Sequence, residues 1–152
     1  MNVAIIGGPG DQGVVDNIMA RVRRHDRVTS LLGTLSLGQL SDFLPTCVLF
    51  VGNNSGPSHL SAALGVPTVA VHSGVIASEE WGPQGPAGVA VRRELTCAPC
   101  YIAMVEQCHR HLECVVRLTA GEVLNVCRPL LALGLATADD APREAAEAPA
   151  HA

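Results

Sequence analysis

The feature that most constrains this fold is an alternation of short apolar runs with helical stripes of apolar side chains. Runs that end in glycine or other turn residues predict buried strands. Between them, apolar residues recur every three or four positions, which is typical of helices packed on one face. Such alternation predicts a Rossmann-like α/β fold, a parallel sheet with helices on both faces. The expected strands lie at 2–8, 28–32, 47–52, 67–73 and 88–94, and the expected helices at 14–22, 37–44 and 58–65, with a last helix from Thr119.

The length of 152 residues is enough for one domain with a real core. We expect this domain over residues 1–136. Residues 137–152 are rich in alanine, proline and charge and lack large apolar side chains, so we predict a disordered tail there. No apolar run approaches the ~20 residues that span a bilayer, and the start lacks the basic segment of a signal peptide. We therefore expect a soluble, cytoplasmic protein without a transmembrane segment.

The formal net charge of −4 is unevenly distributed along the chain. Four acidic residues against Arg143 place −3 of it in the tail, which leaves −1 for the body. A nearly neutral body lacks the basic surface that nucleic acids or anionic membranes attract. The sequence therefore argues against either as a partner.

Three loops at the ends of expected strands stand out, at residues 7–11, 52–57 and 72–75. In an open parallel sheet, loops that leave the carboxyl ends of strands share the edge where ligands bind. The first two lead into helices, whose N-termini attract anions through free N–H groups. Ser55 offers a hydroxyl, and His59 lies one turn into the following helix. The pattern predicts a site for a phosphorylated, nucleotide-like ligand, although glycine-rich turns also serve tight packing alone.

A family resemblance is carried by "NNSGPSHLSAALGVPTVAVHS" (53–73), followed by "EEWGPQGP" (79–86) and "CAPC" (97–100). These stretches resemble the C-terminal half of glycosyltransferase family 9, the lipopolysaccharide heptosyltransferases. The opening "IIGGPGD" and the later stretch "LLGTLSLGQL" match the same half in order, so the resemblance covers about residues 3–130. Asn54 stands where the family usually has aspartate.

The resemblance implies a GT-B architecture, in which two Rossmann-like domains face each other across a cleft. This chain would correspond to the half that binds the nucleotide-sugar donor, such as ADP-heptose. The acceptor, a lipopolysaccharide core or another glycan, would bind a further N-terminal domain or a partner chain. The catalytic base is expected there and not in this chain, and transfer needs no metal.

Matched position by position, the resemblance also implies which residues meet the donor. One group would line the nucleotide side, a second would meet the sugar and diphosphate, and a third would form the floor of the cleft. In that order they are Gly7, Gly8 and Pro9; Asn54, Ser55, Gly56 and His59; and Ser73 and Gly74. Apart from the resemblance, the tryptophan at position 81 would stack on a base or sugar, or would plug its own loop.

Four cysteines fall in residues 95–118, which we call the cysteine segment. Cys97, Cys100, Cys108 and Cys114 are spaced C-x2-C-x7-C-x5-C. A close cysteine pair with two more thiolates can form a tetrahedral structural zinc site. A disulfide, an iron–sulfur site and four reduced thiols are the alternatives.

Two other functions fit the same sequence features. A related GT-B enzyme such as a nucleotide-sugar epimerase would share the fold and the loops. A non-catalytic module would instead use the cysteine segment to bind zinc and a protein partner.

Overall fold

The computed structural model describes residues 1–140, which form two compact units. Unit 1 is Met1–Phe43, and unit 2 begins at Leu44. Both are built from parallel strands and helices, which confirms the predicted α/β class. Each unit has a parallel sheet of its own.

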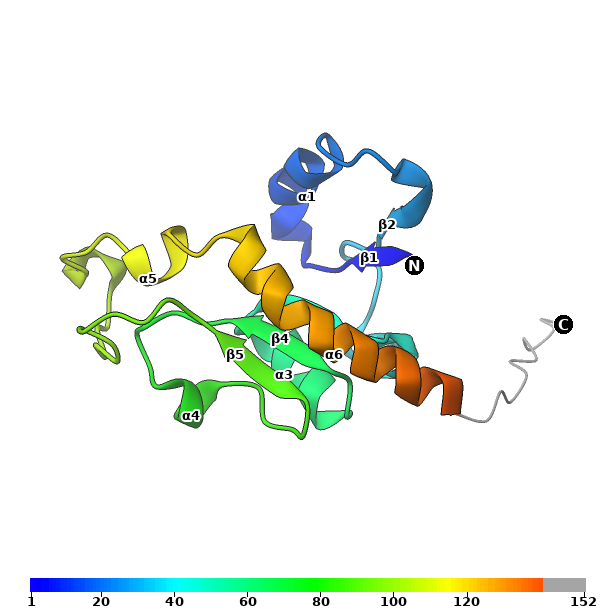
Figure 1. The fold of residues 1–152 in the computed structure, drawn as a ribbon. Helices are drawn as coiled ribbons and strands as arrows, with labels where there is room; N and C mark the ends of the chain where they lie inside the picture. The colour runs from blue at the N-terminus through cyan, green and yellow to red at the C-terminus, as the bar shows by residue number, and fades with distance from the viewer. Residues whose placement is uncertain (141–152) are drawn as a thin grey trace, which may run out of the picture. The chain divides into compact units, whose positions relative to one another are not determined.

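Unit 1 is a two-stranded parallel sheet in which Val3 pairs with Val28. A helix lies along one side of the two strands (Figure 1). Val15 of that helix is buried, whereas Val3 is 47% exposed, so this small sheet leaves much of its apolar surface uncovered. The elements are β1 (Val3–Ile5), α1 (Gln12–Met19), β2 (Val28–Ser30) and α2 (Leu37–Phe43), with 3-10 turns at Pro9–Asp11 and His25–Arg27.

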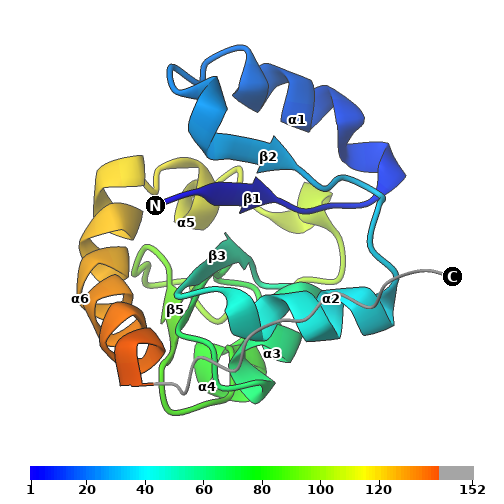
Figure 2. The same ribbon diagram turned by 90° about the vertical axis from the view of Figure 1, so that its right-hand side faces the viewer.

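Unit 2 is a three-stranded parallel sheet in the order β3-β4-β5. Its register pairs Asn53 with Val71, and Val71 with Val91. Helices α3 and α6 cover opposite faces of this sheet (Figures 1 and 2). The elements are β3 (Phe50–Asn53), α3 (Gly56–Ala63), β4 (Thr68–Val71), α4 (Ser78–Trp81), β5 (Gly88–Val91), α5 (Glu113–Val116) and α6 (Ala120–Asp140), with 3-10 turns at Leu44–Thr46 and Val105–Gln107.

The core of unit 2 lies between the sheet and α6. Val69 and Val91 project from the strands against Cys127 of the helix, and all three are buried. On the opposite face, buried Thr68 contacts α3, where its Oγ1 lies 2.9 Å from the Ser61 Oγ. Alternate residues of β4 therefore face α6 and α3, as the pleat of a strand requires. Further side chains packed against the core are Leu49, Val71, Leu118, Val123, Val126 and Leu130.

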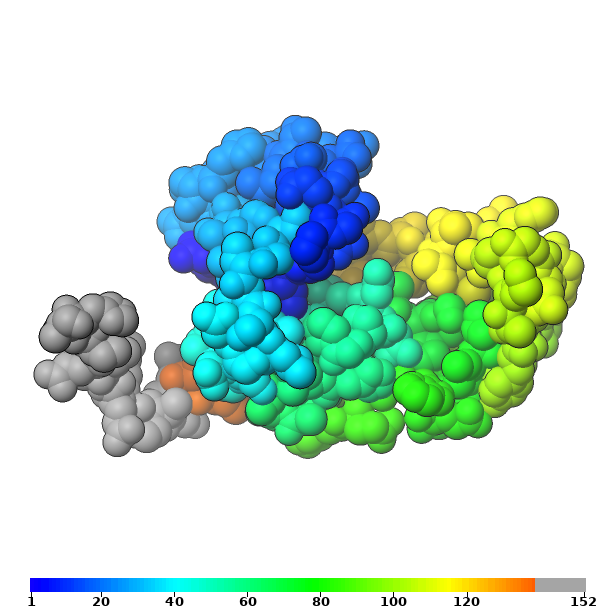
Figure 3. Space-filling model, turned by 180° about the vertical axis from the view of Figure 1, so that it is seen from behind, coloured from blue at the N-terminus to red at the C-terminus, as the bar shows by residue number. Residues whose placement is uncertain are grey.

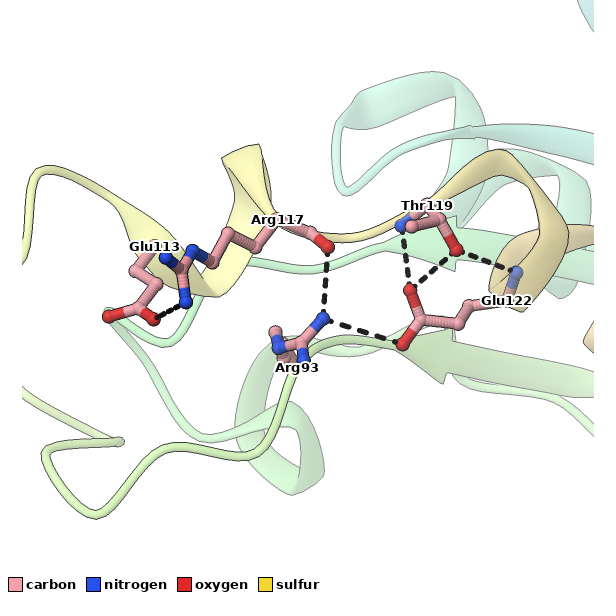
Figure 4. Close-up of polar contacts among 5 residues, drawn as sticks. All are labelled: Arg93, Glu113, Arg117, Thr119 and Glu122. Carbon is pink, nitrogen blue, oxygen red and sulfur yellow. Dashed lines mark hydrogen bonds and ion pairs between the residues drawn. The ribbon is translucent and has the colours of Figure 1, made fainter.

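The predicted capping box at the start of α6 is confirmed. The Thr119 N–H and Oγ1 both donate to Glu122 Oε2 at 2.7 Å, and the Glu122 N–H donates to Thr119 Oγ1 at 3.2 Å. Arg93, just after β5, donates to the Arg117 carbonyl at 3.0 Å and forms an ion pair with Glu122 (Figure 4). These contacts fix the start of the helix to the carboxyl end of the sheet.

The helix continues further than the sequence predicted. The predicted tail begins at residue 137, but α6 runs past Gly134 to Asp140, with Pro129 inside it. A Cβ at Gly134 would collide with the carbonyl oxygen of Val48. This glycine therefore permits close packing of the helix on the segment before β3, and does not end the helix. The rest of the predicted tail, residues 141–152, lies outside the described residues.

In the described part of the chain, no helix is both long enough and apolar enough to cross a membrane.

Candidate functional site

A cleft of about 270 Å³ opens at the carboxyl ends of β3 and β4. Two predicted donor-binding residues, Asn54 and Ser73, line it together. The other lining residues, which sequence reasoning missed, are Asn53, Val71 and Val115. This is the edge of a parallel sheet at which ligands bind, so we take this cleft as the candidate site.

Asn54 gives the cleft an unused hydrogen-bond acceptor. Its N–H donates to the Val71 carbonyl at 2.9 Å, which is the last bond of the pairing between β3 and β4. Its side-chain Oδ1 is buried and has no hydrogen-bond partner among the described residues. A buried polar atom left unpaired costs about 1–3 kcal/mol. A ligand group that donates a hydrogen bond here would recover that cost.

The turn before α3 is held by serine side chains. The Ser55 N–H donates to Ser58 Oγ at 3.1 Å, and that hydroxyl donates to the Ser55 carbonyl at 2.7 Å. The Ser55 Oγ donates to the Asn53 carbonyl at 3.2 Å. Ser58 is fully buried, whereas Ser55 is exposed. The Ser55 hydroxyl oxygen can therefore still accept a hydrogen bond from a ligand.

The same turn offers fewer free amides than its position before a helix suggests. The N–H groups of Ser58 and His59 donate to the Ser55 carbonyl at 3.0 and 3.3 Å, and Pro57 has no N–H. Among the described residues, the Gly56 N–H is the amide of this turn without a hydrogen-bond partner. Anion binding by this helix end therefore depends on Gly56.

His59 does not line the cleft but contacts Trp81. The two rings meet edge to face, with centroids 6.3 Å apart and an interplanar angle of 79°. Trp81 remains 58% exposed, so it is not a plug for its loop. On the other side of α4, the Tyr101 hydroxyl donates to Glu80 Oε1 at 3.0 Å, which raises the pKa of Tyr101. Helix α4 is thus tied both to α3 and to the cysteine segment.

Gly74 is buried under the cysteine segment and does not line the cleft. A Cβ at this glycine would lie 3.0 Å from the Ala98 Cβ and 3.4 Å from the Cys114 Cβ. Its carbonyl accepts a hydrogen bond from the Cys100 N–H at 3.0 Å. The contact is part of a broad one, and Figure 3 shows the yellow-green segment against the green part of unit 2. Gly74 therefore acts in packing.

The glycines of unit 1 are also explained by local packing. The Gly8 N–H, just before the turn Pro9–Asp11, donates to Asp11 Oδ2 at 2.9 Å. A Cβ at Gly7 would lie 2.9 Å from both that oxygen and the Leu32 Cδ1. The Asp11 carboxylate therefore already accepts the hydrogen bond of the Gly8 N–H, which was expected to attract a ligand anion. Donor contacts by this loop stay a prediction.

The structure does not cluster the predicted metal ligands Cys97, Cys100, Cys108 and Cys114, and metal binding by them stays a prediction. In residues 1–140, no three cysteine, histidine, aspartate or glutamate side chains are placed to hold a metal ion, and the six cysteines are free thiols. The reason is that the sulfurs have separate surroundings. Cys114 is buried beside Gly74, whereas the Cys108 Sγ accepts the Leu112 N–H at 3.2 Å.

An ion-pair network holds α5, which brings Val115 to the cleft. Glu113 pairs with Arg110 at 2.7 Å and with Arg117 at 2.9 Å (Figure 4 shows the second pair). Both arginines lower the pKa of Glu113, chiefly through the Arg110 hydrogen bond. The sequence gave no periodicity from which to predict this four-residue helix, so the contribution of Val115 could not be predicted.

Comparison with known proteins points to one family. Residues 1–109 match the model of glycosyltransferase family 9 (heptosyltransferase). Two proteins called lipooligosaccharide heptosyltransferase 2, from Campylobacter jejuni serotypes O:2 and O:6, are 28% and 25% identical over 133 and 125 residues. These alignments cover 86% and 81% of this chain, but 41% and 39% of the relatives. The chain thus spans about two fifths of their length.

Two solved structures share the fold. One is the E. coli ADP-heptose LPS heptosyltransferase II, with a TM-score of 0.69 at 20% identity. The other is the glycosyltransferase family 9 protein from Veillonella parvula, with a TM-score of 0.70 at 19% identity. Each comparison covers 87% of this chain and 37% of the other. Since the family model matches most of the sequence and the same fold recurs in these structures, this chain belongs to glycosyltransferase family 9.

Proposed function

We propose that this chain is a donor-binding part of a family 9 glycosyltransferase, and that its cleft binds a nucleotide-activated sugar such as ADP-heptose. The observation that carries the proposal is the buried, unpaired Asn54 Oδ1 at a cleft on the carboxyl edge of a parallel sheet. The names of the relatives support this sugar class, since they are heptosyltransferases and one is specified for ADP-heptose. The sugar would pass to a lipopolysaccharide core or another glycan.

In this proposal the residues of the turn have separate tasks. Asn54 accepts a hydrogen bond from a sugar hydroxyl, while the Gly56 N–H donates to a phosphate oxygen. The Ser55 hydroxyl, at the exposed start of α3, turns toward the diphosphate. Donors placed where negative charge grows on the departing diphosphate would lower the barrier to transfer. The base that deprotonates the acceptor hydroxyl is a carboxylate outside this chain, and no metal takes part.

His59 supports the donor indirectly. Its ring packs edge to face against Trp81, which is largely exposed and so is available for stacking on a base or sugar. His59→Ala should therefore weaken donor binding without unfolding the domain. His109→Ala, at an exposed histidine of the cysteine segment, is the matched control and should leave binding unchanged.

Titration calorimetry with ADP-heptose tests the proposal, with thermal shift as a second readout. We expect saturable heat and a rise in melting temperature, because a ligand that binds only the folded state stabilises it. GDP-mannose serves as the control nucleotide sugar. No heat and no thermal shift with ADP-heptose would contradict the proposed donor site. Equal affinity in wild type and His59→Ala would contradict a role of His59 in donor binding.

A further inference from the structure

Three polar residues directly follow the three paired strands of unit 2. The N–H of Asn54 donates to the Val71 carbonyl, and the N–H of His72 donates to the Val91 carbonyl, both at 2.9 Å. These are the last bonds of the two ladders, and the residues that directly follow β3, β4 and β5 are Asn54, His72 and Arg92. Because side chains alternate along a strand, His72 projects to the side of Thr68, which is the side that α3 covers, and the same alternation places Asn54 and Arg92 on that side. We call these three residues the polar row.

Each member of the polar row carries an unused polar atom. In the described part of the chain, the buried side-chain nitrogens and oxygens without a hydrogen-bond partner are Asn54 Oδ1, His72 Nε2 and Arg92 Nη1. His72 is 2% exposed, and the side chain of Arg92 is 14% exposed. Folded proteins pair nearly all such atoms. Three neighbouring exceptions at the ligand-binding edge of a sheet therefore indicate a binding role.

The donors and acceptors of the row define the chemistry of its ligand. The His72 Nδ1 lies 2.6 Å from the Ser73 carbonyl oxygen, which can only accept, so Nδ1 carries the proton. In the neutral ring, Nε2 is then an acceptor. The row presents two acceptors, from Asn54 and His72, and one donor, from Arg92. An anion would face both acceptors, whereas hydroxyl groups donate and accept and so match the whole row.

The row meets the cleft at Asn54, while His72 and Arg92 lie beyond the residues that line it. Asn54 lines the cleft and is also the first member of the row, and Ser73, beside His72, lines it too. We propose that the polar row binds hydroxyl groups of the donor sugar, and that His72 and Arg92 determine which sugar this chain accepts. This inference rests on the proposed function and extends it from the turn before α3 to the ends of β4 and β5.

The test compares ADP with ADP-heptose, which carries the sugar and lacks the extra negative charge of the free terminal phosphate; the comparison is therefore made between variants and wild type. Wild-type protein should bind ADP-heptose more tightly than ADP. His72→Phe keeps a ring of similar shape but removes the nitrogens, and should lower the ratio of the two affinities about tenfold, as loss of one good hydrogen bond does. His72→Gln restores a polar atom near the position of Nε2 and should recover part of the ratio. Affinity for ADP alone should stay unchanged in both variants.

Thr68→Val is the matched control for a purely structural effect. Thr68 is on the same strand and face and is fully buried, but its hydroxyl is hydrogen-bonded to Ser61 and Val66. This variant should lower the melting temperature and leave the affinity ratio as in wild type. Arg92→Met should also lower the ratio of the two affinities. If His72→Phe does not fold, the ratios measured for Arg92→Met and His72→Gln test the role of the polar row instead.

The outcomes separate the two claims. If wild type binds neither ADP nor ADP-heptose, the proposed function fails and the polar row has no sugar to bind. If wild type prefers ADP-heptose and the row variants keep the full preference, the donor site stands and the role of the row is overturned. A ratio that falls equally in Thr68→Val would also overturn it.

Discussion

The two units start from similar sequence patterns and reach different degrees of burial. Val3 of β1 is 47% exposed, whereas Val69 of β4 is fully buried. The difference lies in what covers the strands. Unit 2 has a third strand and helices on both faces, while unit 1 has two strands and a single buried side chain in α1. Parallel sheets are stable when both faces are covered, so an apolar run alone does not predict a buried strand.

The glycine-rich turns of the two units differ in whether their polar groups have hydrogen-bond partners. In unit 1, Asp11 satisfies the Gly8 N–H, so that turn is complete in itself. In unit 2, the turn after β3 leaves the Asn54 Oδ1 and the Gly56 N–H without partners among the described residues. Glycine content therefore predicts a turn, but the groups left unpaired indicate a site.

The largest expected effect on stability comes from adding one methyl group to a glycine, and it should differ between the two units. Gly134→Ala should destabilise unit 2 by about 3 kcal/mol, because the new Cβ collides with the backbone of Val48. Gly13→Ala in α1 meets nothing within 4 Å and should be neutral or stabilising by up to about 1 kcal/mol, because alanine favours helix. Denaturant unfolding measures both. Equal stability of the two variants would show that unit 2 is no more tightly packed than unit 1.

Hydrogen exchange should show the next largest difference. The Leu31 N–H donates to the Ile5 carbonyl at 2.8 Å in unit 1, and the His72 N–H donates to the Val91 carbonyl at 2.9 Å in unit 2. Although these bonds are alike, we expect the His72 amide to exchange ~100-fold more slowly, because its strand opens only with the larger core. Similar rates would contradict the difference in stability between the units.

Removal of the α6 cap should have a smaller effect. Thr119→Ala deletes the hydroxyl that pairs with Glu122 and should cost about 1 kcal/mol in thermal unfolding of unit 2. Thr119→Ser keeps the hydroxyl and is the control. If the alanine and serine variants melt together, the capping box contributes nothing.

The smallest expected effect is on acid stability. Hydrogen bonds from Thr119 lower the pKa of Glu122, and Arg110 lowers that of Glu113. Because these folded-state pKa values lie below the unfolded values, the stabilisation is present above the unfolded pKa and is lost as the pH falls through the folded pKa. Glu113→Gln should therefore flatten the acid side of the stability curve. An unchanged slope in that variant would show that the ion pairs of Glu113 do not contribute.

Sequence reasoning succeeded where a feature depends on neighbours along the chain. The alternating strands and helices and the Thr119 capping box follow from local patterns, and the motif around Asn54 led to the correct family. It failed where partners are distant. The packing of Gly134 against Val48 is visible only in the structure, and the cysteine spacing does not show that Cys114 is buried beside Gly74. The polar row depends on the register of three strands, which no single segment contains.

The most direct test of the donor site is an NMR titration of the ¹⁵N-labelled protein with ADP-heptose. A second cleft, of about 170 Å³, is lined by residues including Gly65, Val66 and Gly134 and provides an internal comparison. We predict saturable shifts in the amides of Asn54, Gly56 and Ser73, with those of Gly65 and Val66 unchanged. Shifts confined to Gly65 and Val66, or no shift at any of these amides, would contradict a donor site at the carboxyl edge of the sheet.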